Sequence, residues 1–206
     1  MYKIDMTKLH YLSGLLIAAF VGVHIVNHIN ILWGKEFYMA TMDLFRIIYR
    51  NSAIETLLLL AVVVQIITGI KLYIRNRKQA STFFEKLHIR TGLYLAFFFV
   101  IHITAVMVGR AILHQDTNFY YGAAGLNQFP FNLYFIPYYL LAIISFFGHL
   151  TAVHHVKMKE SILGITPVVQ SIIILIVGCA LAMIVVWGMT NGFRGFAIPT
   201  EYQYRF

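Results

Sequence analysis

Four of the nine histidines in this sequence lie inside long apolar runs. These are His24, His28, His102 and His149. An ionisable side chain is costly to place in hydrocarbon, so each needs a metal, a hydrogen-bond partner or a water-filled cavity. Neutral imidazole is also a good ligand for iron and other transition metals. The other five lie near the ends of the runs, where a solvated or headgroup-facing position is expected: His10, His88, His114, His154 and His155.

One spacing pattern occurs twice. The two copies are His10-x-x-Ser13-Gly14 followed ten residues later by His24, and His88-x-x-Thr91-Gly92 followed ten residues later by His102. Both are predicted on helices that run in the same direction, and fourteen residues of helix rise about 21 Å, so His24 and His102 are expected at one depth. This arrangement favours a pair of axial ligands to haem iron, with the glycines giving a flat macrocycle room at the backbone. The alternative is that the small residues serve helix packing and the histidines bond to neighbouring carbonyls.

His28 is an alternative ligand to His24. It lies four residues further along and shares the same helix face. It is therefore placed to replace His24 on iron, to bond a haem propionate or to face a quinone. The repeat selects His24.

Gln65 and His149 form a second, weaker pair. Gln65 precedes Arg75 by ten residues and His149 precedes Lys157 by eight, so both are expected at a similar depth in the half of the membrane nearer the N-terminus. An amide is a poor iron ligand, so a two-histidine site cannot be built from these positions alone. They are expected to hydrogen-bond each other, to position a quinone, or to leave a haem with His149 alone as ligand. One haem b is therefore expected and a second is possible, and without a C-x-x-C-H motif neither would be attached covalently.

The elements that must hold these residues are transmembrane helices. With 60% hydrophobic residues, the 206-residue chain has too little polar surface for a soluble globule. The expected fold is all-α, a single domain over residues 1–206 that forms an integral membrane bundle of five helices. The predicted spans are His10–Trp33, Ile54–Tyr73, Ile89–Leu113, Leu133–His154 and Pro167–Thr190. Aromatic and charged residues between the first two spans predict a helix in the interface plane, and residues 119–139 predict an aromatic interfacial loop.

The basic residues predict the orientation of the bundle. The N-terminal tail and the second and fourth loops together hold ten Lys and Arg, including Lys3, whereas the opposite side holds six, including Arg205. Because cytoplasmic loops carry the excess of positive charge, the N-terminus is expected in the cytoplasm and the C-terminus outside. Membrane topology also accounts for the net charge of +8, so nucleic acid is not an expected partner.

The order and spacing of several short motifs point to a known family. The motifs are Leu9-His10…Ser13-Gly14…His24, Glu55 with Gln65-Ile-Ile-Thr-Gly69, Thr91-Gly92…His102, His149, and Leu163-Gly-Ile-Thr-Pro167. Over nearly its whole length the chain resembles the five-helix cytochrome b anchor subunit of succinate dehydrogenases and fumarate reductases, of the type with two haems. The resemblance implies that His24 and His102 ligate an outer haem and that His149 ligates an inner one. Gln65 departs from the family, whose two-haem members have histidine there.

The resemblance also implies partners and a location. Family members lie in the bacterial cytoplasmic (inner) membrane, carry a flavoprotein and an iron–sulfur protein on the cytoplasmic face, and exchange electrons with menaquinone or ubiquinone in the respiratory chain. This chain has no flavin fingerprint, cysteine cluster or nucleophile triad. It is thus expected to transfer electrons as a membrane anchor and not to convert the substrate itself.

Three alternatives remain open. Leu9-His10-Tyr11-Leu12-Ser13 is also similar to the start of the bacterial cytochrome b561 group, whose members act alone on quinol, superoxide or ferric iron. A non-haem metal enzyme would use His24-x-x-x-His28 and His154-His155, although these motifs are expected at different depths. A structural or assembly role would leave the four apolar-run histidines without a metal.

Overall fold

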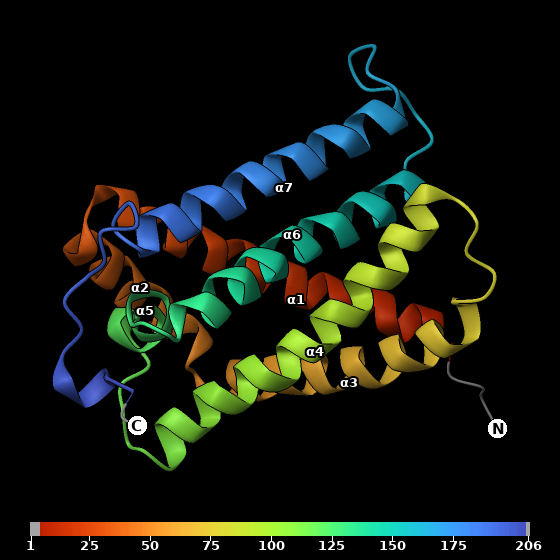
Figure 1. Ribbon diagram of the computed structural model, residues 1–206. Coiled ribbons are helices and arrows are strands. Elements are labelled where there is room, and N and C mark those ends of the chain that lie inside the picture. Colours follow the sequence, from red (N-terminus) through yellow and green to blue (C-terminus); the bar gives the residue numbers. More distant parts are fainter. Residues whose placement is uncertain (1–4, 205–206) are drawn as a thin grey trace.

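The computed structural model describes residues 5–204, which form a bundle of long helices (Figure 1). The elements are α1 (Met6–Ile29), η1 (Asn30–Trp33), α2 (Lys35–Tyr49), α3 (Ser52–Asn76), α4 (Phe83–Ala111), α5 (Phe119–Asn127), α6 (Asn132–Lys157), α7 (Pro167–Met189) and η2 (Thr200–Tyr202). Within this range no strand is present, and a single β-bridge joins Ile162 to Ile165. The expectation of an all-α fold is therefore confirmed for these residues.

Five of the helices are long and apolar enough to cross a bilayer. They are α1 with its extension η1, α3, α4, α6 and α7, and their most apolar segments have a mean hydropathy between 1.6 and 2.8. Large apolar side chains on their outer faces remain exposed, for example Leu15 at 59% and Ile176 at 62%. Such surfaces suit lipid and not water. The chain is thus a multi-pass membrane protein, as its composition predicts.

Capping residues make the first and third spans begin earlier than the hydropathy pattern predicts. The Asp5 carboxylate accepts hydrogen bonds from the backbone N–H groups of Thr7 and Lys8, so α1 begins at Met6. Thr82 and Glu85 form a capping box, so α4 begins at Phe83. Each cap satisfies N–H groups that a helix start leaves unpaired. Both helices therefore contain an additional turn before their first histidine.

The spanning helices contact one another in the order α1, α3, α4, α6, α7 and back to α1. Thus the five helices form a closed ring around a central space, in which α7 packs against both α6 and α1 (Figure 1). The α6–α7 contact is very close at Gly178, where an added Cβ would lie 2.1 Å from the Phe147 Cβ. A residue without a side chain is required there.

The two ends of the bundle differ. The starts of α1, α4 and α7 share one end, called here the N-terminal end, whereas α2, α5 and the residues after α7 gather at the opposite, C-terminal end (Figure 1). The helix predicted between the first two spans is observed as α2. The prediction of a loop at residues 119–139 is wrong, because Asn118 caps the helix α5. Phe119, the first residue of α5, is fully buried. Lys3 and Arg205, which enter the charge count, lie outside the described residues.

Candidate functional site

His24 of α1 and His102 of α4 face each other across the central space. Their ring centroids lie 6.4 Å apart and the ring planes make an angle of 63°. Metal–nitrogen bonds to histidine measure about 2 Å, so two imidazoles on opposite sides of one iron have ring centres about 6 Å apart. The pair predicted from the repeated spacing is therefore brought to the separation of two axial ligands.

An aromatic ring supports each of these histidines. Phe20 stacks on His24 with centroids 5.7 Å apart and an angle of 16°. Phe98 stacks on His102 at 4.9 Å and 13°. Each phenylalanine lies four residues before its histidine, on the same helix face. Sequence reasoning missed both residues, although this shared spacing extends the repeat and was visible in the sequence.

His28 lies between His24 and Tyr38 and hydrogen-bonds to both. Tyr38 of α2 is 4% exposed, and burial raises the pKa of its hydroxyl. The hydroxyl lies 3.2 Å from His28 Nδ1, and His28 Nε2 lies 3.1 Å from His24 Nε2. Because His24 and His28 are both on α1, the Nε2 atom of His24 is directed toward a residue of its own helix.

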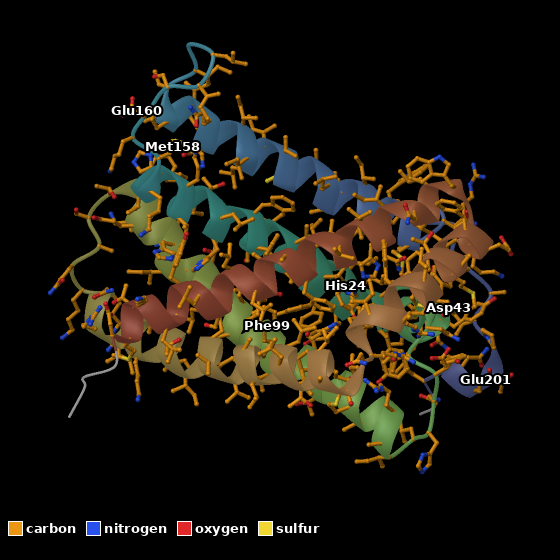
Figure 2. All side chains as sticks on the ribbon, turned by 180° about the vertical axis from the view of Figure 1, so that it is seen from behind. His24, Asp43, Phe99, Met158, Glu160 and Glu201 are labelled. Carbon is orange, nitrogen blue, oxygen red and sulfur yellow. The ribbon has the colours of Figure 1, made fainter. Side chains whose placement is uncertain are left out.

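An elongated apolar cavity surrounds these side chains. His24, His28 and His102 line it together with apolar residues from all five spans, and at the C-terminal end it reaches Arg50, Glu55 and Arg110. Glu55 and Arg110 form an ion pair, with Arg110 Nη2 donating to Glu55 Oε2 at 3.2 Å. Figure 2 shows His24 inside the bundle, on the side toward α2, which carries Asp43. The cavity thus combines apolar walls with three imidazoles and, at one end, two arginines and a glutamate. We call His24, His28 and His102 the His24 cluster.

A second cluster lies nearer the N-terminal end, where His10 was expected in water. His10 Nδ1 instead lies 2.8 Å from Thr68 Oγ1, and His10 Nε2 lies 3.1 Å from Gln65 Nε2. Ser13 Oγ donates to Gln65 Oε1 at 2.7 Å. The sequence predicted a solvated or headgroup-facing His10, whereas the structure shows a half-buried side chain with two hydrogen-bond partners on α3.

His88 and His149 belong to the same cluster. Their Nε2 atoms are 3.2 Å apart, and the rings of His10 and His149 have centroids 6.5 Å apart at 72°. His88, also predicted to be solvated or headgroup-facing, is half-buried and contacts His149 on α6. Gln65 and His149 share a depth as predicted, but Gln65 bonds to His10 and Ser13, and His149 bonds to His88. We call His10, His88 and His149, with Gln65, the His10 cluster.

The remaining histidine pair has separate partners. His154 Nε2 lies 2.9 Å from Gln170 Oε1 on α7, and His155 stacks on Phe84 at 3.8 Å. Among residues 5–204, no group of three or more His, Cys, Asp or Glu is arranged to hold a bare metal ion. His154 and His155 thus contact residues outside both clusters.

Comparison of the chain with protein-family models, with curated proteins and with solved structures finds no match. The site must therefore be interpreted from its own geometry.

Proposed function

We propose that this chain is a membrane cytochrome that binds haem b between His24 and His102 and carries electrons within the bilayer. One observation supports this most directly: two imidazoles from helices 78 residues apart in sequence meet at a centroid separation of 6.4 Å inside an apolar cavity. Two buried imidazoles are costly in hydrocarbon unless something binds them. A shared iron would bind both.

The protein's own residues would prepare this site. A bound haem would supply one-electron chemistry by cycling between ferric and ferrous iron. Phe20 and Phe98 hold the two imidazole rings in position and exclude water from them. His28 covers His24 Nε2 with a hydrogen bond and must turn aside when that nitrogen binds iron.

The rim of the cavity would receive the propionates. Arg110 lies at the C-terminal end of α4, paired with Glu55, and Arg50 donates to Thr117 Oγ1 at 2.8 Å. A carboxylate in this region would gain charge-assisted hydrogen bonds from guanidinium groups.

The electron partners follow from the family resemblance. We infer that the N-terminal end faces the cytoplasm of a bacterial inner membrane and carries a flavoprotein and an iron–sulfur subunit, with quinone as the membrane partner. A basic surface supports this inference: Arg77, Lys78, Lys86 and Arg90 surround one shallow pocket at the α3–α4 connection. Positive charge favours a cytoplasmic position and an acidic protein surface.

The test is a reduced-minus-oxidised optical spectrum with a pyridine haemochrome count on the purified chain. The expected result is b-type haem whose content falls when His24 is changed to alanine. His114→Asn is the matched control, because His114 is exposed and has a φ of 51°, which asparagine tolerates. Absence of haem from the wild-type chain would overturn the proposal. Purification with flavin and iron–sulfur centres would support the partner assignment, and a fully active single subunit would contradict it.

A further inference from the structure

The connection between α3 and α4 lies at the N-terminal end of the bundle (Figure 1), and a pocket opens there. Its volume of about 560 Å³ is within the range of about 300–1,000 Å³ that is usual for small-molecule sites. The residues that line it are Tyr73, Arg77, Lys78, Ala80, Lys86, Ile89, Arg90 and Leu93. This lining contains four cations and no acid, so the pocket favours an anionic occupant.

The four cations of this pocket form no ion pair within the described part of the chain. The one carboxylate nearby on α4 belongs to Glu85, and it accepts hydrogen bonds from the backbone N–H groups of Ser81 and Thr82 in the capping box. The Arg77 guanidinium carbon lies over the ring of Tyr73, 5.6 Å from its centroid. This contact orients the guanidinium group but does not neutralise its charge.

The cations and the apolar residues of the pocket are ordered by depth. Arg77 lies just beyond the end of α3, and Tyr73 lies one helical turn deeper. On α4, Lys86, Arg90 and Leu93 share one face and follow one another into the bundle. Leu93 is 43% exposed and lies about 15 Å along α4 from its start. Cations near the water with apolar surface beneath them match the order of headgroup and acyl chain in a phospholipid.

A phospholipid fits this order better than a soluble anion or an acidic protein. Either of these would reach the cations from the water, but neither would cover Leu93 and Ile89 on the membrane side. The basic end of the bundle does not by itself create such a site. Lys157, for example, lies over the ring of Tyr11, with its Nζ 4.9 Å from the centroid, and is not among the residues that line the pocket.

We propose that the pocket binds the headgroup of an anionic phospholipid, with its phosphate held by Arg77 and Arg90 and an acyl chain lying along Leu93. Guanidinium groups form paired, charge-assisted hydrogen bonds with phosphate oxygens. Basic pockets between transmembrane helices are suited to acidic lipid headgroups. The lipid contacts both α3 and α4 and neutralises charges that otherwise repel one another across their connection. This inference does not depend on haem.

The experiment is native mass spectrometry of the purified chain in detergent with added phosphatidylglycerol. Phosphatidylcholine with the same acyl chains is the neutral comparison and should bind more weakly. Each cation near the membrane surface contributes about fivefold to the affinity for an anionic lipid, so Arg77→Gln combined with Arg90→Gln should weaken binding about 25-fold. The matched control is Lys157→Gln combined with Lys159→Gln, which removes the same charge at the same end and should leave the affinity unchanged.

Each contrary outcome has a distinct meaning. Equal weakening in the control would show diffuse attraction to the basic end, and equal retention of phosphatidylcholine would show that charge is not recognised; either overturns the proposal. Inorganic phosphate that competes at the same concentration as the lipid would overturn the role of the acyl chain. Binding of poly-glutamate to these arginines, without any preference among lipids, would assign the pocket to an acidic protein instead.

A second variant keeps the proposal testable if the arginine variant does not accumulate. Lys78→Gln combined with Lys86→Gln removes the other two cations and should weaken phosphatidylglycerol binding to a similar extent, whereas unchanged binding would overturn the site. The haem content of all these variants should equal that of the wild type, because this pocket and the cavity of the His24 cluster share no lining residue. Failure of this inference is thus distinguishable from failure of the proposed function.

Discussion

The repeat on α1 and α4 places His24 and His102 in the His24 cluster, and His10 and His88 in the His10 cluster. The surroundings of the two clusters nevertheless differ. The first opens into a cavity lined by apolar residues, and Phe20 and Phe98 stack on its imidazoles. The second is surrounded by Ser13, Gln65 and Thr68, which satisfy His10 completely. The comparison teaches that the repeat positions imidazoles at two depths, whereas the non-repeated residues determine how each imidazole is held.

The most severe test of this comparison is His102→Ala. It removes an imidazole for which no neighbouring histidine substitutes across the His24 cluster, so the haem assigned there should be lost entirely. Haem content and optical spectra of the purified, membrane-inserted variant measure this. Unchanged haem content would contradict the ligand assignment and with it the distinction between the two clusters.

Thr68→Val sharpens the comparison at the other cluster. The change keeps the shape of the side chain but removes the acceptor for His10 Nδ1. A buried polar group that loses its partner typically costs about 1–3 kcal/mol. Unfolding in mixed detergent should occur at lower denaturant concentration, while the haem content of the His24 cluster is unchanged. Loss of haem from the His24 cluster would show that the two clusters are not independent.

Gly178→Ala should separate bundle stability from both clusters. The new Cβ would collide with Phe147, so the α6–α7 contact must open. Overpacking of this kind typically costs about 1–3 kcal/mol. Unfolding in mixed detergent should occur at lower denaturant concentration, with haem content unchanged because Gly178 and Phe147 are not among the residues that line the cavity. A change in haem content would show that the α6–α7 contact shapes the cavity.

Tyr38→Phe should have the smallest effect. It removes the hydroxyl that hydrogen-bonds to His28 Nδ1 and leaves the aromatic ring in place. A net hydrogen bond of this type contributes about 0.5–1.5 kcal/mol. The expected result is a modest shift in the midpoint potential of the haem at the His24 cluster, with full haem content. An unchanged midpoint potential would contradict the role of Tyr38 and His28 beside His24.

Part of the fold and of the site was predictable because apolar length and helical spacing are local properties. Five apolar runs were sufficient to predict five spans, and the duplicated spacing was sufficient to select His24 and His102. The positions of His10 and His88 were not predicted, because the caps at Asp5 and Thr82 extend α1 and α4 beyond the apolar runs. A hydropathy pattern does not show where capping residues extend a helix. It also did not predict α5, which begins at a capping residue, Asn118.

By itself, the amino-acid sequence determined that this chain lies in a membrane and that two helices carry the same histidine pattern. Only the tertiary structure decided which polar groups meet: Gln65 pairs with His10 and not with His149, and His28 lies between His24 and Tyr38. The physical reason is that depth along a helix follows from residue number, whereas the partner across the bundle depends on helix order and rotation. Those are set by close contacts such as Gly178 against Phe147, which involve residues distant in sequence.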